Sequence, residues 1–248
     1  MVATVFFLMW MLPAVAENAA ERLLAGYESI PQLSCELRRD VKSADGETVR
    51  FLSRIYFQRP DRLHAENLSP VKRRTICDGT ILRQYTEGLP RGFSRPVSEL
   101  QGDLLTNLRM LPGSNANELE PLRGLDEIAL PPGDKEAAVR VGYVPAAGKS
   151  FVVLSFDTEG RWTRMETFES PEMRECSLRA EWSDFQSLGN GVWMARRQNT
   201  WLRLAGVDRT EIVHVENISV EAPIPAAMFD ANAFFKGVEF TDSFEKMF

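Results

Sequence analysis

The sequence predicts a mainly β protein with a few helices, in which the helices cover one large, curved antiparallel sheet. Apolar and polar residues alternate along about ten extended runs, and short turn signals rich in glycine separate these runs. Runs that are joined by short turns pair as hairpins, which builds an antiparallel sheet. A sheet of roughly ten long strands twists and curls. Only the segments with helical periodicity are then free to cover its concave face.

The first sixteen residues predict a secretory signal peptide. The segment MVATVFFLMWMLPAVA carries no charge and is short for a helix that crosses a membrane. It ends in a small-x-small pattern, Ala14 to Ala16, which is typical of signal-peptidase sites. No lysine or arginine precedes the apolar run, so an uncleaved anchor or a buried helix stays open. We expect a signal peptide over residues 1–16 and a single domain over residues 17–248.

Two parts of the chain have helical periodicity. Apolar residues recur at three-to-four spacing over residues 17–30, which predicts an amphipathic helix that Pro31 ends. The leucines of residues 100–111 have the same spacing and predict a second helix, which ends at a Pro-Gly step. The segment NANELEPLRGL predicts a further short helical piece. The mid-chain helix is the natural lid of a concave sheet because one of its faces is apolar.

Two hairpins follow the first helix. LSCELRRDV and SADGETVRFLSRIYFQRP pair around a turn at residues 44–46, and RTICDGTILRQY folds around Asp78-Gly79, where glycine accepts a positive φ. Pro60 has no N–H to donate to a ladder, so it belongs at a strand end or at a sheet edge. Alternation places Val49, Phe51, Ile55 and Phe57 on one face of a strand and Arg50, Arg54 and Gln58 on the other.

Strands return in the second half of the chain. The turn signals Thr158-Glu159-Gly160 and Leu188-Gly189-Asn190-Gly191 separate neighbouring strands of this half. The closing segment PAAMFDANAFF predicts an extended or one-turn stretch. The expected strands of this half are residues 138–144, 150–157, 161–168, 174–185, 192–204 and 210–220.

Composition excludes some classes of function. The formal net charge is −6, whereas nucleic-acid binding needs a positive surface, so we expect no nucleic-acid partner. Cys35, Cys77 and Cys176 lack metal-ligand spacing and allow at most one disulfide; which two would pair stays open, and three small buried residues are the alternative. No cysteine closely follows the apolar segment, so we expect the mature protein to be untethered.

The sequence contains few candidates for catalysis. His64 and His214 each lie in a strand, outside any HExxH, HxH or GxSxG pattern. There is no glycine-rich phosphate loop and no paired-carboxylate signature. We therefore expect a protein that is not an enzyme and that has no catalytic residue, cofactor or metal. A hydrolase or metalloenzyme would require one of the two histidines beside a carboxylate or a cysteine in a cleft.

Large apolar side chains alternate along the late strands. Such faces are usually packed, so a core covered by helices is one interpretation. A cavity for an apolar ligand, lined by large side chains with few polar anchors, is the other. The faces concerned carry Val152, Leu154 and Phe156, then Cys176, Leu178, Ala180 and Trp182, then Trp193, Ala195 and Trp201.

The order of the motifs resembles the LolA-like family of periplasmic lipoprotein carriers. The first patch is LSCELRRDVKSADGETVRFLSRIYFQRPDRLHAE followed by RRTICDGTILRQYTEG, in which a strand ends in Arg-Pro and a hairpin turns at Asp-Gly. The second patch is IPAAMFDANAFFKGVEF, which is similar to the closing pattern of the family. The resemblance extends from about Glu17 to Phe240. It implies an incomplete β-barrel, LolA/LolB-like, with helices as a lid.

The resemblance also implies a site and its partners. Arg59 matches the arginine that holds the lid of the family closed until cargo arrives. The implied ligand is the acyl chains of lipoproteins, or another lipid, in an apolar cavity. The implied partners are an inner-membrane ABC release complex and an outer-membrane receptor, met by a periplasmic monomer. The residues expected to line the cavity are Phe51, Phe57, Leu154, Phe156, Trp182 and Trp193, with Leu104 and Leu108 from the lid.

Some features depart from the classical carriers. Ser53-Arg54 stand where those carriers favour a stretch with glycine, and NGVWMARRQ fits the broader lipoprotein-sorting relatives better. The fold therefore transfers more safely than the cargo. An envelope sensor, or a structural interaction protein on the same fold, is the alternative function. An open apolar cavity would indicate a carrier, whereas a filled core would indicate the alternative.

Overall fold

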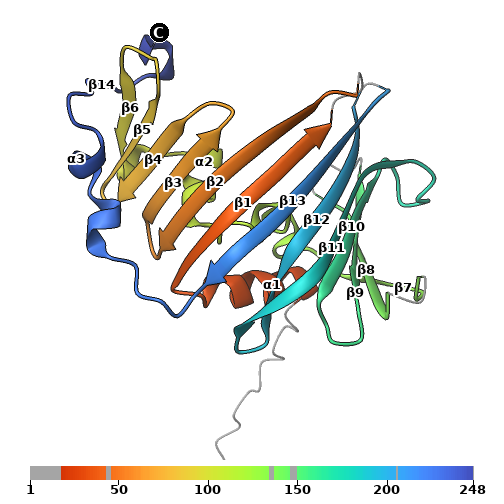
Figure 1. The fold of residues 1–248 in the computed structure, drawn as a ribbon. Helices are drawn as coiled ribbons and strands as arrows, with labels where there is room; N and C mark the ends of the chain where they lie inside the picture. The colour runs from red at the N-terminus through yellow and green to blue at the C-terminus, as the bar shows by residue number, and fades with distance from the viewer. Residues whose placement is uncertain (1–17, 43–45, 134–136, 146–149, 205, 248) are drawn as a thin grey trace, which may run out of the picture.

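The fold is a single large sheet that curls without closing into a barrel (Figure 1). The computed structural model describes residues 18–42, 46–133, 137–145, 150–204 and 206–247, so the predicted signal peptide lies outside the described residues. The fourteen strands formed by the described residues lie in the order β14-β6-β5-β4-β3-β2-β1-β13-β12-β11-β10-β9-β8-β7. The predicted mainly β architecture, with a large curved antiparallel sheet, is confirmed.

The strands form two meanders that meet at β1 and β13. Strand β1 pairs antiparallel with β2 on one side and with β13 on the other. Only the short β14 pairs in parallel, with β6, among the described strands. The first meander consists of β1 Gln32–Lys42, β2 Thr48–Gln58, β3 Arg62–Ser69, β4 Arg73–Asp78, β5 Ile81–Thr86 and β6 Gly92–Pro96. The second consists of β7 Ile128–Leu130, β8 Val139–Tyr143, β9 Phe151–Phe156, β10 Trp162–Phe168, β11 Cys176–Gly189, β12 Val192–Leu204 and β13 Val207–Ser219.

The mid-chain helix is shorter than the leucine spacing predicts. Helix α2 spans Asp103–Arg109, and a separate 3-10 turn, η1, spans Val97–Glu99. The reason is Gly102, whose φ of 55° and ψ of −139° prevent a helix from running through it. The segment NANELEPLRGL forms two 3-10 turns, η2 Ala116–Glu118 and η3 Glu120–Leu122, in place of one helical piece. No helix formed by the described residues is long and apolar enough to cross a membrane.

The N-terminal helix α1, Ala19–Glu28, is fixed at its first turn. Asn18 and Glu21 form a capping box, in which each side chain accepts from the backbone N–H of the other. The Asn18 side chain also donates to the Leu125 carbonyl at 2.9 Å, and the Ala19 N–H donates to Glu127 Oε2 at 2.7 Å. These bonds tie α1 to the segment between η3 and β7.

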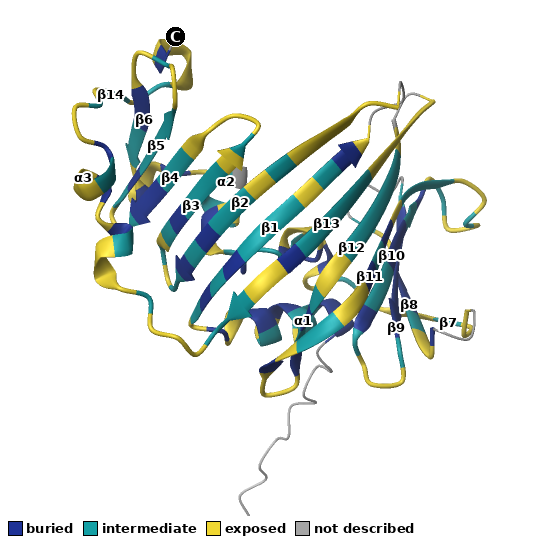
Figure 2. Cartoon of the chain, viewed as in Figure 1, coloured by how far each residue is buried: buried dark blue, intermediate teal, exposed yellow. Residues whose placement is uncertain are grey.

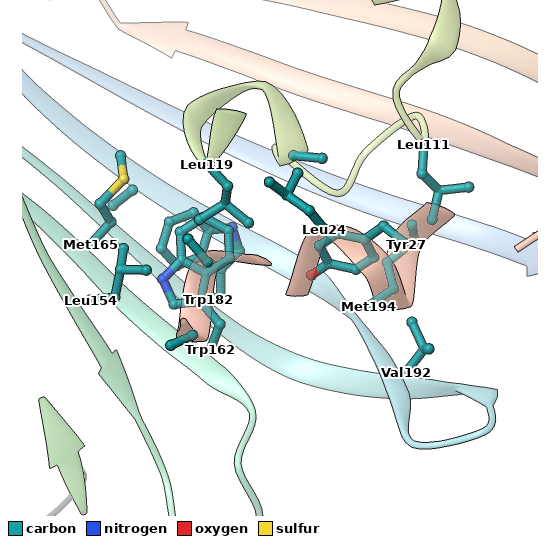
Figure 3. Close-up of a cluster of buried hydrophobic side chains, with 14 of the residues drawn as sticks. Leu24, Tyr27, Leu111, Leu119, Leu154, Trp162, Met165, Trp182, Val192 and Met194 are labelled. Carbon is teal, nitrogen blue, oxygen red and sulfur yellow. The ribbon is translucent and has the colours of Figure 1, made fainter. Parts of the chain in front are cut away.

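The main core lies between the concave face of the sheet and the segments that cover it (Figure 3). Leu24 and Tyr27 of α1 pack with Leu119, while the Trp162 and Trp182 rings approach to 3.9 Å between centroids. Each fully buried large apolar side chain contributes roughly 1.5–3 kcal/mol. Other members of this cluster are Leu33, Cys35, Ile55, Phe57, Leu111, Leu154, Phe156, Met165 and Met194.

A second core lies under α2. Leu108 is buried there against Cys77, Leu82 and Phe93, and Leu104 packs at its margin. The chain terminus reaches the same core through 3-10 turn η5, Phe244–Met247, whose Phe244 ring stacks on Phe93 at 4.0 Å between centroids.

The C-terminal segment covers the opposite, convex face of the first meander. It contains η4 Ala226–Phe229, helix α3 Ala231–Phe234 and β14 Phe240–Thr241, which lie at the left of Figure 1. Ala231 and Phe235 pack against Ile76 of β4. Elsewhere Figure 2 shows exposed and half-buried residues along β1, β13 and β12, so the centre of the convex face meets solvent.

His64 fastens this C-terminal segment to the sheet. The side chain is 2% exposed, and its Nδ1–H donates to the Met228 carbonyl at 2.7 Å, while the Phe234 ring packs edge-on at 4.7 Å. Its Nε2 has no partner among the described residues. Burial lowers the pKa of His64, and Arg74 lowers it further; the bond to Met228 and nearby Glu66 act in the opposite direction. A neutral His64 is thus part of the folded state.

We expect acid to weaken the fold through His64. Its folded pKa is below the unfolded value of about 6.5, so its contribution to stability is complete above that pH and is lost as the pH falls below it. His64→Phe removes this contribution. Urea unfolding at pH 7.5 and 5.5 should show a smaller loss of stability in the variant than in the wild type. His214→Phe is the comparison variant, because the pKa of His214 is also lowered but His214 does not bind the C-terminal segment. Equal losses in wild type and His64→Phe would contradict the assignment.

Candidate functional site

Arg59 joins the end of β2 to the ends of both covering helices. Its backbone N–H donates to the Pro31 carbonyl at 2.9 Å. Its guanidinium donates three further bonds: Nε to the Ile30 carbonyl at 3.0 Å, Nη2 to the Tyr27 carbonyl at 3.1 Å and Nη1 to the Arg109 carbonyl at 3.0 Å. Tyr27 and Ile30 lie at the end of α1, and Arg109 is the last residue of α2. One side chain therefore holds three separate elements together.

The chemistry of these bonds suits an arginine. The last carbonyls of a helix have no partner within the helix and carry partial negative charge. A guanidinium offers five donors in a fixed plane, so it reaches several such carbonyls at once. The Arg59 guanidinium also lies 5.3 Å from the centre of the Phe57 ring, within the range of a cation–π contact. Burial lowers the pKa of Arg59, and nearby Glu28 opposes this effect.

A second tie holds α2 at the same place. The Arg109 side chain donates from Nε to Asp61 Oδ1 at 2.8 Å, so the last residue of α2 is bound through its carbonyl and through its side chain. Asp61 follows Pro60 directly in the sequence. No local pattern predicts this ion pair, because Asp61 and Arg109 are 48 residues apart in the chain.

Two hollows flank α1 on the side of the second meander. The aromatic hollow, of about 160 Å³, lies between α1 and the β11–β12 turn. Arg161 closes one side of it, with its guanidinium 5.1 Å from the Phe185 ring centre and 5.5 Å from that of Trp193.

The side hollow, of about 310 Å³, includes Val141 and Phe156. Residues that line both hollows are Arg22, Leu23, Gly160 and Gly191. Trp162, Trp182, Phe185 and Trp193 line the aromatic hollow.

A third hollow crosses the concave face beyond the helices. This trough, of about 340 Å³, has Leu37, Phe51 and Val213 among its apolar side chains. It is bordered on one side by the loop at Gly113 and Asn115. Its polar residues are Arg39, Ser53, Asn67, Arg73, Gln198 and Glu211.

The residues predicted to line one cavity are distributed over several sites. Phe57 and Leu154 are fully buried in the packed main core. Leu104 and Leu108 pack in the separate core under α2, so they do not face Leu154. The remaining predicted residues line different hollows: Trp182 and Trp193 the aromatic hollow, Phe156 the side hollow, and Phe51 the trough. The predicted single open cavity is therefore divided by packed side chains.

The candidate catalytic residues lie apart from these hollows. His64 faces the C-terminal segment, and His214 lies on the convex face, where it pairs across strands with Arg38 and Arg197. Burial raises the pKa of Cys35 to about 12 and that of Cys77 to about 11, so both thiols are protonated at neutral pH. All three cysteines are free thiols in the structure. The described residues contain no group of three or more His, Cys, Asp or Glu that could hold a metal ion.

Comparison with known proteins finds similarity in fold and none in sequence. No protein-family model and no curated protein sequence matches it. A LolA superfamily protein from Nitrosomonas europaea aligns with a TM-score of 0.52 and 10% identity, over 86% of this chain and 98% of that chain. A DUF1329 family protein from Desulfovibrio piger aligns with a TM-score of 0.56 and 11% identity, over 87% and 95%.

A third solved structure also has a similar fold. It is described as an outer membrane lipoprotein-sorting protein domain from Vibrio parahaemolyticus, and it aligns with a TM-score of 0.56 and 11% identity, over 87% of this chain and 96% of that chain. At such low identity these likenesses show the fold alone. The chain has a LolA-like fold, as the motif order in the sequence predicts.

We expect Arg59→Gln to destabilise the protein by about 2 kcal/mol, because it removes three hydrogen bonds that a half-buried charged donor makes to backbone carbonyls. Arg54→Gln is the matched control: Arg54 lies on β2, the strand that Arg59 follows, but it pairs with Glu36 on the exposed face, where an ion pair contributes about 0–1 kcal/mol. Urea unfolding measures both. Equal losses in the two variants would show that the three carbonyl bonds of Arg59 carry no special weight.

Proposed function

We propose that the protein is a periplasmic carrier that binds the acyl chains of lipoproteins, or of a related lipid, between its sheet and its covering helices, and moves them between membranes. The observation that carries the proposal is the set of three bonds from Arg59 to the ends of α1 and α2. These bonds hold the helices over an apolar concave face, and one side chain controls them all. The LolA-like fold supports the same function.

The energies are compatible with opening by cargo. Hydrogen bonds from a charged donor contribute about 1.5–3 kcal/mol each, so breaking the three bonds of the Arg59 side chain costs about 4.5–9 kcal/mol. A buried methylene group contributes about 0.8 kcal/mol, and a chain of about 12 such groups about 10 kcal/mol. An acyl chain can therefore offset the lost bonds. The hollows beside α1, about 160 and 310 Å³, are where the chain would first enter.

The proposal extends to partners and location. A carrier of this kind would receive its cargo from an inner-membrane ABC release complex and deliver it to an outer-membrane receptor. It would act as a monomer, be exported through the signal peptide at residues 1–16, and need neither catalysis nor a cofactor. The bonds at Arg59 and Asp61 then describe the closed form, which waits for cargo.

One observation favours a second candidate. Much of the concave face under α1 is filled by packed side chains, including the Trp162 and Trp182 rings, which lie in contact at a tilt of 32° (Figure 3). A filled core would suit an envelope sensor or a structural interaction protein on the same fold. The two functions differ in one property, which is whether the space beside α1 accepts an acyl chain.

Binding of a fluorescent fatty acid tests the carrier. Leu23 lines both hollows beside α1, so Leu23→Glu would place an uncompensated charge where the chain enters, and we expect the affinity to fall about tenfold or more. Leu68→Glu is the control, because Leu68 is already 39% exposed on β3. Three tryptophans line the aromatic hollow, so tryptophan fluorescence reports occupancy directly. A wild-type protein that binds no fatty acid, and from which native mass spectrometry finds no bound lipid, would favour the sensor or structural function.

A kinetic measurement tests the role of Arg59 as a latch. If its bonds must break before a chain enters, Arg59→Gln should raise the association rate of the fatty acid by about tenfold, equivalent to about 1.4 kcal/mol. Arg54→Gln should leave the rate unchanged. Stopped-flow fluorescence measures both rates. A destabilised Arg59→Gln protein that binds at the wild-type rate would show that Arg59 supports the fold without gating entry.

A further inference from the structure

The trough is built as an amphipathic surface. Its residues come from six neighbouring strands, from β4 and β3 through β2, β1 and β13 to β12. The apolar side chains Leu37, Phe51 and Val213 lie on β1, β2 and β13, among polar side chains from the same strands and from β3, β4 and β12. A purely apolar ligand would leave these polar groups without partners, which is unfavourable. The composition therefore fits a ligand with both an apolar and a polar part.

The charge of the trough is positive. Its charged residues are Arg39, Arg73 and Glu211, which sum to 2 − 1 = +1 on a chain of net charge −6. Arg39 is already engaged, because its Nε is 3.5 Å from Glu211 and its guanidinium lies 4.9 Å from the Phe51 ring centre. Arg73 makes no ion pair with any described residue. Its positive charge is uncompensated at the edge of a concave surface.

Neutral donors lie beside that charge. The Asn67 Oδ1 accepts from the Ser53 hydroxyl at 3.0 Å, which leaves the Asn67 amide N–H groups without a partner among the described residues. Asn67 lies directly opposite Arg73 on the neighbouring strand. A guanidinium and an amide donor side by side are suited to an anion such as a phosphate group.

The trough and the aromatic hollow lie on two sides of one loop. Gly113 lines both, Ser114 lines the aromatic hollow and Asn115 lines the trough. The loop lies close to the sheet: a Cβ on Gly113 would be 3.4–3.5 Å from the side chains of Val215 and Leu37. It continues the chain from α2, which Arg59 and Asp61 hold. The loop is also anchored in the main core on both sides, by the buried Leu111 and Ala116.

We propose that the trough binds the anionic head group of an amphiphile whose acyl chain occupies the aromatic hollow, with the loop at residues 113–115 above the junction. Arg73 and Asn67 bind the anion, and Arg39 supports the apolar floor through Phe51. This rests on the proposed carrier function and narrows its cargo to lipids with a phosphate-like group next to the chain. Free phosphate offers the same chemistry, so the test includes it.

Binding of two lysolipids, measured by tryptophan fluorescence, tests the proposal. We expect wild-type protein to bind lysophosphatidylglycerol about tenfold more tightly than zwitterionic lysophosphatidylcholine. Arg73→Gln should remove most of this preference and leave binding of the zwitterionic lipid unchanged. Arg174→Gln removes the same charge from an exposed position outside the trough, and it should keep the preference. Inorganic phosphate should compete weakly with the anionic lipid in the wild type and not in Arg73→Gln.

The outcomes separate the two proposals. Equal affinity for both lipids would overturn the head-group site and leave the carrier function standing. Failure of both lipids to bind would overturn the carrier function and the head-group site with it. Tight binding of inorganic phosphate, without any preference between the lipids, would show a site for free anions and overturn the assignment to an amphiphile.

Discussion

The pairing of β1 with β13 is the interaction on which the rest of the molecule depends. It joins the first strand of the chain to one that starts 165 positions after β1 ends, and so fuses two meanders into one curved sheet. The register sets Leu37 beside Val215 and Arg39 beside Val213, which forms the centre of the concave face. Strand β2, the other neighbour of β1, ends at Gln58, so that Arg59 lies within reach of both helices. The single curved sheet and the floor of the trough both depend on this pairing.

The two faces of the sheet differ in their side chains, which are largely polar on the convex face and largely apolar on the concave face. On the convex face, cross-strand ion pairs such as Arg54–Glu36 and Arg50–Asp40 keep the central strands compatible with water. On the concave face the apolar side chains exceed what α1, α2 and the 3-10 turns can seal, so hollows remain along α1 and beyond the loop at Gly113. Space beside the helices thus arises because the helices are too short to cover the whole concave face, and it needs no dedicated cavity-forming motif.

Local patterns predict local structure well here and spatial arrangement poorly. The alternation in β1 and β2, the three-to-four apolar spacing of α1 and the Arg-Pro step all carry signals, because each acts within a few residues. The short strands β6 and β7 lack a usable period, and Gly102 shortened a helix that leucine spacing alone extends. Phe51 and Phe57 share a strand face, yet one lines an open trough and the other is fully buried, because distance from the helices decides between them. The patch RRTICDGTILRQYTEG contains Arg73 but gives it no role, because its place in the trough depends on strands that are far apart in the sequence.

The two outermost strands of the sheet affect whether its edges can pair with strands of other molecules. Exposed strand edges recruit other chains by backbone hydrogen bonding, and long flat edges lead to polymers. Here the outermost strands are β7, with three residues, and β14, with two. Neither offers enough N–H and C=O groups to template an incoming strand. The short outer strands therefore limit pairing of the sheet edges between copies of the chain.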